Sequence, residues 1–522
     1  MTLFGERRRP HPALLAAGAV AVVVGVYLRF WTPSALWLDE TISVDIARLP
    51  LSKIPAALSH DGAPPLYYVL LHFWMRLFGQ GDGAVRALSG LTSVVTLPVF
   101  WLAGRRIGGR PVAWVAFFLA LSSPFAINYA TTTRMYSLMV LLSVLGFLAL
   151  SAVMENPTRG RRVALGAVTA ALLYTHYWAI YLVLVTGLWL LWRVLARGDG
   201  GPALRAMIVG GLLWLPWVPV FFFQTLHTGT PWTSAASPGD LLTVFGDWSG
   251  GGPWGGLLMF ATFLLFVLGT FGRTAAPGAM VTIDDGRGGT RQVEAGPAVL
   301  IELSPRPGMG PMVGVAVATL VTAVVLGAIA NAAFVARYTA VVLPLFLLVM
   351  ASGLAVVPGR RFRAGCLSVL VLAGLLTGRS ENSQQRTQAV QVAAVLNSQA
   401  SPGDLVIYCP DQLGPAVNRL LRVPGVQQIT FPRAIGPARV NWVDYKKTIA
   451  STNVSQFTEN ALQRVGPNHT VWLVWRDGYP SLGGNCGYIK SWLDLLRQSG
   501  VTLIGANGWQ YYEFENLTRY AG

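Results

Sequence analysis

Two adjacent acids, Asp39 and Glu40, follow Trp37 shortly after the first long apolar run of the sequence. A carboxylate near hydrocarbon is unfavourable unless it is solvated, paired or lining a cavity; at the centre of a span it costs about 2.5–3.5 kcal/mol. A carboxylate in a cavity can take the proton of a hydroxyl as a general base. The pair is therefore either an ordinary solvated loop pair or part of a catalytic wall.

Several basic side chains are expected at the same membrane face as Asp39: His60, Arg86, Arg134, His176 and Arg337. Arginines bind phosphate through charge-assisted hydrogen bonds and stabilise its charge as it leaves. A carboxylate that faces them suits an acceptor hydroxyl attacking a lipid-linked phosphosugar, so the catalytic interpretation is preferred. The alternatives left open are a headgroup anchor for Arg134 and hydrogen-bonded interface roles for the two histidines.

The composition indicates the kind of chain that must position these residues. Of the 522 residues, 53% are hydrophobic and only 12% are charged, whereas soluble domains carry about 25% charged residues. The chain is therefore an integral membrane protein. Its net charge of +16 arises largely from arginines that flank apolar runs, which is typical of topology signals and argues against nucleic-acid binding.

Apolar runs long enough, or nearly so, for the roughly 20 residues of a bilayer crossing predict about eleven spans. They begin near Leu14, Ala87, Val112, Ser137, Val163, Ile180, Met207, Leu257, Met312, Ala340 and Leu367. Residues 64–78 are apolar but too short, and if they crossed, the arginine clusters of later loops would fall outside. The positive-inside rule therefore predicts an interfacial helix there, with the N-terminus cytoplasmic.

None of the 23 acidic residues lies in the middle of an apolar run. Ion-coupled transporters need ionisable residues near the midplane. Chemistry at the outer surface is therefore favoured over transport, and the first outer loop (32–85) is the expected place for it.

The polar tail, residues 380–522, predicts an extracytoplasmic α/β domain with a partly parallel sheet, separate from a membrane domain of residues 1–379. A buried strand is expected at 404–409, a second strand at 470–475, and helices at 387–397 and 489–498, the latter preceding a strand-like run at 501–504. Cys409 and Cys486 both lie in this tail and are either a disulfide or two unrelated thiols.

Two further loops are long. Residues 222–254, with Trp232, Asp240, Asp247 and Trp248, are interpreted as a mobile flap that orders over the site when substrate arrives. Residues 273–311 form a Gly- and Pro-rich cytoplasmic loop for which the sequence predicts no function.

An ordered string of motifs carries a family resemblance. It consists of Asp39-Glu40, the segment HDGAPPLYY at 60–68, Gly79 to Arg86, Tyr129 to Tyr136, and later Arg337-Tyr338. The string resembles the GT-C glycosyltransferases of the protein mannosyltransferase and aminoarabinose-transferase superfamily. That family uses polyprenyl-phosphate sugars, inverts the anomeric centre, often does not depend on a metal, and carries two membrane-surface helices in its first outer loop.

The resemblance assigns roles residue by residue. It implies that Asp39 is the catalytic base, with Glu40 assisting contacts to acceptor or donor. Arg86, Arg134, Arg337 and Tyr338 are implied to bind the carrier phosphate, while His60, Tyr67, Tyr136 and His176 are candidates for substrate contacts. Family members often have a second acid before the span near Ser137, whereas this chain has Thr131-Thr132-Thr133-Arg134. No metal ligands are therefore assigned: no cofactor is expected to be required, and a divalent metal is the less favoured alternative.

The predicted protein is thus a polytopic α-helical membrane enzyme of GT-C type in the cell membrane. It moves a sugar from a polyprenyl-phosphate donor to an envelope glycan, glycolipid or protein. The composition resembles actinobacterial proteins, which makes mannose the favoured sugar and arabinofuranose the second. A lipid-linked sugar flippase and a catalytically silent scaffold are the alternatives.

Overall fold

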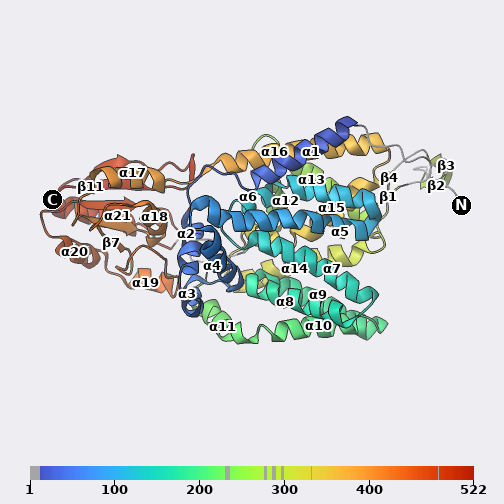
Figure 1. The fold of residues 1–522 in the computed structure, drawn as a ribbon, viewed down its shortest axis with the longest axis horizontal. Coiled ribbons are helices and arrows are strands. Elements are labelled where there is room, and N and C mark those ends of the chain that lie inside the picture. Colours follow the sequence, from blue (N-terminus) through green and yellow to red (C-terminus); the bar gives the residue numbers. More distant parts are fainter. Residues whose placement is uncertain are drawn as a thin grey trace.

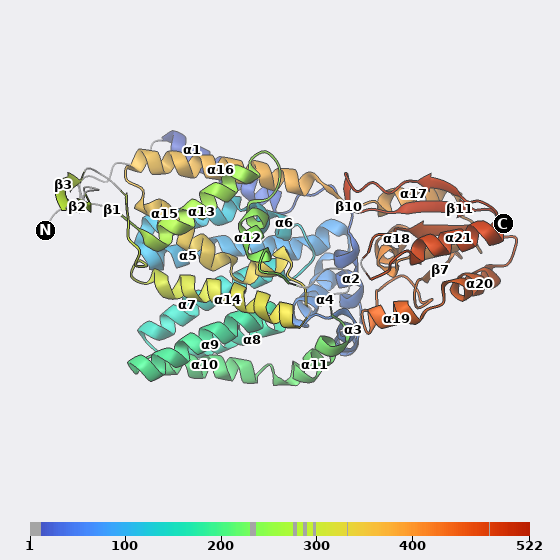
Figure 2. The ribbon, with the colours of Figure 1, turned by 180° about the vertical axis from the view of Figure 1, so that it is seen from behind.

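The computed structural model describes residues 12–229, 236–274, 279–284, 290–295, 299–330, 332–479 and 481–522. A helical bundle forms the middle of the molecule, the C-terminal α/β part lies at one end, and the strands β2 and β3 lie at the other (Figures 1 and 2). Both views also place helices α2, α3 and α4 between the bundle and the tail. We call the end of the bundle next to the tail the tail end.

Each predicted apolar run lies within or next to a helix of this bundle. The helices are α1 (Pro12–Leu28), α5 (Asp82–Ser122), α7 (Tyr136–Glu155), α8 (Arg159–Thr175), α9 (Trp178–Arg197), α10 (Gly201–Leu212), α11 (Val218–His227), α13 (Gly255–Phe271), α14 (Met309–Ile329), α15 (Leu343–Val356) and α16 (Arg360–Ser383). Among the described residues, six helical segments are long and apolar enough to cross a membrane, and four further apolar helices are shorter. The prediction of a polytopic helical membrane protein is confirmed.

Helix α5 contains the two spans predicted from Ala87 and Val112. The chain reverses between them at Gly108 and Gly109, where Gly109 has a φ of +69° that side chains rarely adopt. A Cβ on Gly104 would lie 2.8 Å from the Ala113 Cα. The two arms therefore pack closely against each other, and glycine is needed both at the turn and at the contact.

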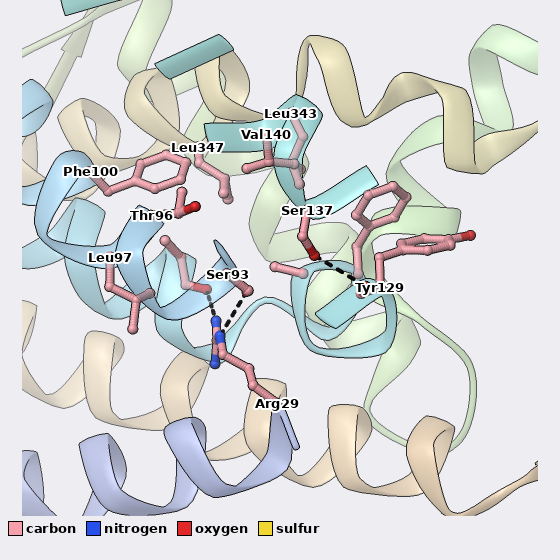
Figure 3. Close-up of a pocket in the computed structure, with 13 residues that line it drawn as sticks. Arg29, Ser93, Thr96, Leu97, Phe100, Tyr129, Ser137, Val140, Leu343 and Leu347 are labelled. Atoms are coloured by element: carbon pink, nitrogen blue, oxygen red, sulfur yellow. Dashed lines mark hydrogen bonds between the residues drawn. The ribbon is translucent and has the colours of Figure 1, made fainter. Parts of the chain in front are cut away.

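Arg29 connects α1 to both arms of α5 inside the bundle (Figure 3). Its guanidinium donates to the Ser93 hydroxyl at 3.0 Å and to the carbonyls of Gly25, Ala120 and Leu121 at 2.6–2.8 Å. These carbonyls lie in the last turns of α1 and α5, where a cation is favoured by the helix dipole. Arg29, which is 1% exposed, thus fixes three helical segments beneath the tail end.

The first loop folds into helices α2 (Leu38–Ala47), α3 (Ile54–Asp61) and α4 (Leu66–Phe78). Helix α4 buries Tyr67, Tyr68 and Leu71 while Phe73 and Leu77 on its other face stay exposed. At 13 residues it is too short to cross a bilayer. The structure thus contains the short amphipathic helix predicted at 64–78, while its position in the membrane interface stays a prediction.

The tail begins with strand β5 (Gln385–Thr387), which pairs in parallel with β10 (Tyr511–Glu513). Its main sheet has the order β7-β6-β8-β11-β9, with β6 (Leu405–Cys409), β7 (Gln427–Thr430), β8 (Val471–Trp475), β9 (Val501–Ile504) and β11 (Asn516–Tyr520). Strands β6, β7 and β8 are parallel, whereas β11 runs antiparallel to β8 and β9. The predicted α/β tail with a partly parallel sheet is confirmed, while the exact domain boundary at 379/380 stays a prediction.

The tail helices are α17 (Ala389–Gln399), α18 (Gly414–Leu420), α19 (Tyr445–Ser451), α20 (Val454–Val465) and α21 (Asn485–Arg497). Cys409 at the end of β6 forms a disulfide with Cys486 in α21. The sequence left open whether these cysteines form a disulfide or stay two separate thiols, and the structure contains the disulfide.

The loop 273–311 includes short strands at the end of the bundle opposite the tail. They are β1 (Gly272–Thr274), β2 (Ala279–Asp284), β3 (Thr290–Ala295) and β4 (Val299–Ile301), paired β1 with β4 and β2 with β3.

Candidate functional site

Asp39 lies in the first turn of α2, facing two arginines that come from distant parts of the chain. Its Oδ2 atom is 3.7 Å from the Arg337 Nη1 and 4.0 Å from the Arg134 Nε. Among the described residues, this oxygen, the Arg134 Nε and the Arg337 Nε are buried without a hydrogen-bond partner. The three side chains are therefore close enough to attract one another, yet keep hydrogen-bonding capacity that a substrate can use.

Glu40, the next residue, is in a different environment. Its carboxylate accepts two hydrogen bonds from Arg86, at 2.8 Å from Nε and 2.6 Å from Nη2, and a third from the Thr133 amide at 2.9 Å. Burial by itself would raise the pKa of Glu40, but the charge and hydrogen bonds of Arg86, helped by Arg386 and Thr133, hold it below its usual range. Glu40 is therefore ionised and fully paired.

The rest of the Arg86 guanidinium is also occupied. It donates to the carbonyls of Ser34 and Ala35 at 2.6 and 3.0 Å, and the residue is only 5% exposed. Phosphate binding by Arg86 and substrate contact by Glu40, both implied by the resemblance, would require this pair to open. The contacts favour a role for both in holding the first loop on α5, and the predicted roles stay untested.

Arg134 lies in the turn between α6 (Pro124–Ala130) and α7, at the centre of a polar network. Its Nη1 donates to the hydroxyls of Ser43 and Tyr68, both at 3.1 Å, and the Tyr68 hydroxyl donates to Asp61 at 3.0 Å. Burial raises the pKa of Asp61, while the nearby Arg134 opposes this shift. Tyr68 and Asp61 thus orient Arg134. Both residues belong to the motif HDGAPPLYY, but the sequence did not predict this role for them.

An aromatic wall lines the same region. Tyr338 lies in the 3-10 helix η3 (Ala336–Val341) with its ring centroid 4.8 Å from that of His176, which is in turn 6.0 Å from Tyr136. The Tyr136 hydroxyl is buried without a partner among the described residues. His176 accepts the Trp178 amide at Nδ1, at 3.1 Å, which leaves its Nε2 as the proton-bearing nitrogen. The predicted residues Tyr136, His176, Arg337 and Tyr338 are thus brought together.

Two other predicted residues lie apart from Asp39. The Tyr67 hydroxyl is hydrogen-bonded to Ser89 at 3.0 Å and is buried below the loop. His60 is exposed at the end of α3, where its Nδ1 is 2.9 Å from the Ala56 carbonyl. A direct role in chemistry stays a prediction for both.

The tail supplies residues that the sequence did not identify. Arg386, in β5, donates to the Thr131 carbonyl and hydroxyl at 2.7 Å and lies 3.8 Å from Glu40. Glu513, in β10, accepts the backbone amide of Leu38 at 2.9 Å. Only pairing of β5 with β10 brings these residues to the first loop, so no local sequence signal could have found them.

The threonine turn before α7 connects the tail to the first loop. Thr131 accepts hydrogen bonds from Arg386 and donates one to the Asn382 side chain at 3.1 Å, and the Thr133 amide donates to Glu40. Within the described ranges, no group of three or more His, Cys, Asp or Glu residues is placed to hold a metal ion.

Part of the loop predicted as a flap is a packed helix, α12 (Asp240–Ser249). Trp248 is buried and donates to the Thr339 hydroxyl at 2.8 Å, and the Gly251 amide donates to Glu381 at 2.9 Å. Trp232 lies outside the described residues. Residues 240–251 therefore contact both η3 and the end of α16, and movement of this loop stays a hypothesis.

Comparisons with known proteins agree with this architecture. A family model described as dolichyl-phosphate-mannose-protein mannosyltransferase matches residues 62–219. No curated protein sequence matches the chain.

Solved structures match over most of the chain. The crystal structure of ArnT from Cupriavidus metallidurans bound to undecaprenyl phosphate has a TM-score of 0.58 at 14% identity, covering 97% of this chain and 98% of that one. Its apo form also gives 0.58 at 14%, covering 97% of both chains. An Archaeoglobus fulgidus oligosaccharyltransferase in complex with Zn and sulfate gives 0.51 at 11%, covering 88% of this chain and 67% of that one.

The matched family model and the matched folds are those of transferases, in agreement with the enzyme class predicted from the sequence. The resemblance predicted from the ordered motifs is confirmed as well. The chain is a membrane protein with the GT-C glycosyltransferase fold and a C-terminal α/β domain.

Proposed function

We propose that this protein is an inverting glycosyltransferase that moves a sugar from a polyprenyl-phosphate donor to a hydroxyl acceptor at the tail end of the bundle. The observation that carries the proposal is the Asp39 carboxylate, which faces Arg134 and Arg337 at 3.7–4.0 Å with an oxygen free of hydrogen bonds. The undecaprenyl phosphate bound to ArnT supports a carrier of this chemical class.

In the proposed reaction, Asp39 takes the proton of the acceptor hydroxyl. The acceptor oxygen attacks the anomeric carbon from the face opposite the phosphate. The bond between that carbon and the phosphate oxygen breaks, and polyprenyl phosphate leaves with the electron pair. Arg134 and Arg337 stabilise the negative charge on the departing phosphate.

We further propose that the tail end faces the outside of the cell. Arg105 and Arg106 lie next to the reversal of α5, and Arg161 and Arg162 lie at the start of α8. Both clusters are therefore at the end of the bundle away from the tail, and basic clusters prefer the cytoplasmic side. A disulfide in the tail also fits an oxidising compartment. Mannose is the favoured sugar and arabinofuranose the second, with a component of the cell envelope as acceptor.

The test is transfer of radiolabel by the purified protein in lipid vesicles. Polyprenyl-phosphate mannose and polyprenyl-phosphate arabinofuranose are supplied separately, with membranes of the source organism as acceptor. We expect label to pass from one donor into a product that no longer extracts with it, also in the presence of a chelator, since the two arginines carry the phosphate charge. Absence of transfer from every polyprenyl-phosphate sugar would overturn the proposal.

A further inference from the structure

The segment Tyr512-Glu513 of the tail is fastened to the segment that precedes the catalytic acid. The Glu513 carboxylate accepts the Leu38 amide at 2.9 Å and the Thr387 hydroxyl at 3.0 Å. Leu38 is the residue immediately before Asp39. Strand β10 is thereby held beside the start of α2, although the two lie at opposite ends of the sequence.

This attachment creates an aromatic corner. The rings of Trp37 and Tyr512 lie 5.2 Å apart at 86° to each other. Tyr512 is 68% exposed although its neighbours Tyr511 and Glu513 in β10 are buried. Alternation of side chains along β10 accounts for this exposure, and it leaves the face of the Tyr512 ring open to a ligand beside Trp37.

The corner lies beside the reacting groups. Trp37 is two residues before Asp39 and occupies the N-cap position of α2. Tyr512 is close enough to Arg337 to interact electrostatically with it, and Arg337 is one of the two arginines that face Asp39. A molecule seated on the Tyr512 ring would therefore reach the base from the tail side, whereas the donor lipid approaches from the membrane.

The chemistry of the corner favours one class of acceptor. The C–H face of a sugar ring is apolar and packs on an aromatic face, while its hydroxyls stay free around the rim. One of those hydroxyls can then point to Asp39. A peptide acceptor would instead be expected to pair with an unpaired strand edge, and β10 has one strand partner, β5, among the described residues. The exposed ring of Tyr512 favours the saccharide, and the protease and periodate sensitivity of the product separates the two.

We propose that Trp37 and Tyr512 form an acceptor subsite for a saccharide ring, assembled jointly by the first loop and the tail. The proposal rests on the proposed glycosyltransferase function and adds the acceptor class and its binding residues. Glu513 is a positioning residue in it, because it holds the two aromatic residues together through Leu38.

The experiment uses the full-length protein in vesicles with the labelled donor and native membranes described above. The product is first classified by its sensitivity to protease and to periodate. The acceptor concentration is then varied for wild type, Tyr512→Ala and Tyr512→Phe. Tyr488→Ala is the matched control, since Tyr488 is a 62% exposed tyrosine elsewhere in the tail.

We expect a periodate-sensitive, protease-resistant product, and an acceptor KM raised about tenfold in Tyr512→Ala, as stacking worth about 1.4 kcal/mol implies. Tyr512→Phe keeps the ring and should raise KM less, and donor KM should not change. Equal acceptor KM in Tyr512→Ala, Tyr488→Ala and wild type would overturn the subsite, as would a protease-sensitive product. Failure of wild type to consume any donor would instead overturn the proposed function, and the subsite with it.

Discussion

The carboxylate of Glu40 and the guanidinium of Arg86 form a buried two-point ion pair, with Oε1 to Nε at 2.8 Å and Oε2 to Nη2 at 2.6 Å. Asp39, one residue earlier, has no comparable bond at its Oδ2. Two adjacent acids are thereby placed in different environments, because α2 turns one toward α5 and the other toward Arg134 and Arg337.

The first prediction concerns the base. Asp39→Asn cannot accept the acceptor proton and should lower kcat by about 100-fold or more, measured as label transfer under saturating donor. Asp45→Asn, in the same helix but paired with the exposed Arg48, should keep near wild-type transfer. Similar rates for Asp39→Asn and wild type, at equal protein in the folded peak of a sizing column, would remove Asp39 from the mechanism.

The second prediction concerns the phosphate. Arg134→Gln and Arg337→Gln each remove a charge that we propose contacts the donor, so donor KM should rise about 10- to 100-fold, as expected for hydrogen bonds to charged groups. Arg379→Gln is the control, since Arg379 is exposed and lies near the C-terminal end of α16. The measurement is a donor titration at fixed acceptor, and an unchanged donor KM in both variants would contradict the assignment.

The third prediction separates scaffold from substrate contact at Arg86. Breaking a buried pair leaves an unpaired charge and typically costs about 3–5 kcal/mol. Glu40→Gln and Arg86→Gln should therefore each lower the midpoint of thermal unfolding in detergent, and the double variant should lose less than the sum of the two. A normal melting curve for Arg86→Gln with a raised donor KM would instead support the phosphate role.

The fourth prediction concerns pH. Burial raises the pKa of Asp411 from 3.8 to about 7, only partly opposed by the Tyr445 hydroxyl and by Arg433. Because the folded chain holds this proton more tightly, the stability it contributes is full below about pH 4 and is lost as pH rises to about 7, by up to roughly 4 kcal/mol. Asp411→Asn should flatten the pH dependence of tail unfolding, whereas Asp477→Asn, at an exposed position, should not. An equally steep profile in Asp411→Asn would contradict the shift.

The fifth prediction concerns the disulfide. Cys409 and Cys486 are 77 residues apart, so their bond restrains a long loop and should stabilise the tail by about 4.5 kcal/mol. Double replacement by serine should lower the unfolding temperature of the tail. Both cysteines are buried in the folded tail, so thiol-reactive mass labelling is done on the denatured protein and should modify them only after reduction. Labelling without reduction would argue against an oxidised tail.

The sequence by itself determined the elements of this protein. Apolar runs, arginine flanks and the short segment 64–78 predicted the helices of the bundle and the interfacial helix, because bilayer thickness and local hydropathy constrain each segment separately. The strands at 404–409 and 470–475 were recognisable from their residues for the same reason. Asp39, Arg134 and Arg337 were identified from residue type and order.

Only the tertiary structure decided how these residues are used. Pairing of Glu40 with Arg86 depends on how α2 packs on α5, and pairing of β5 with β10 brings Arg386, Tyr512 and Glu513 to the first loop. The choice between a disulfide and two thiols depends on where α21 lies against β6. These contacts join segments far apart in the chain, and no periodicity or local spacing encodes a long-range contact.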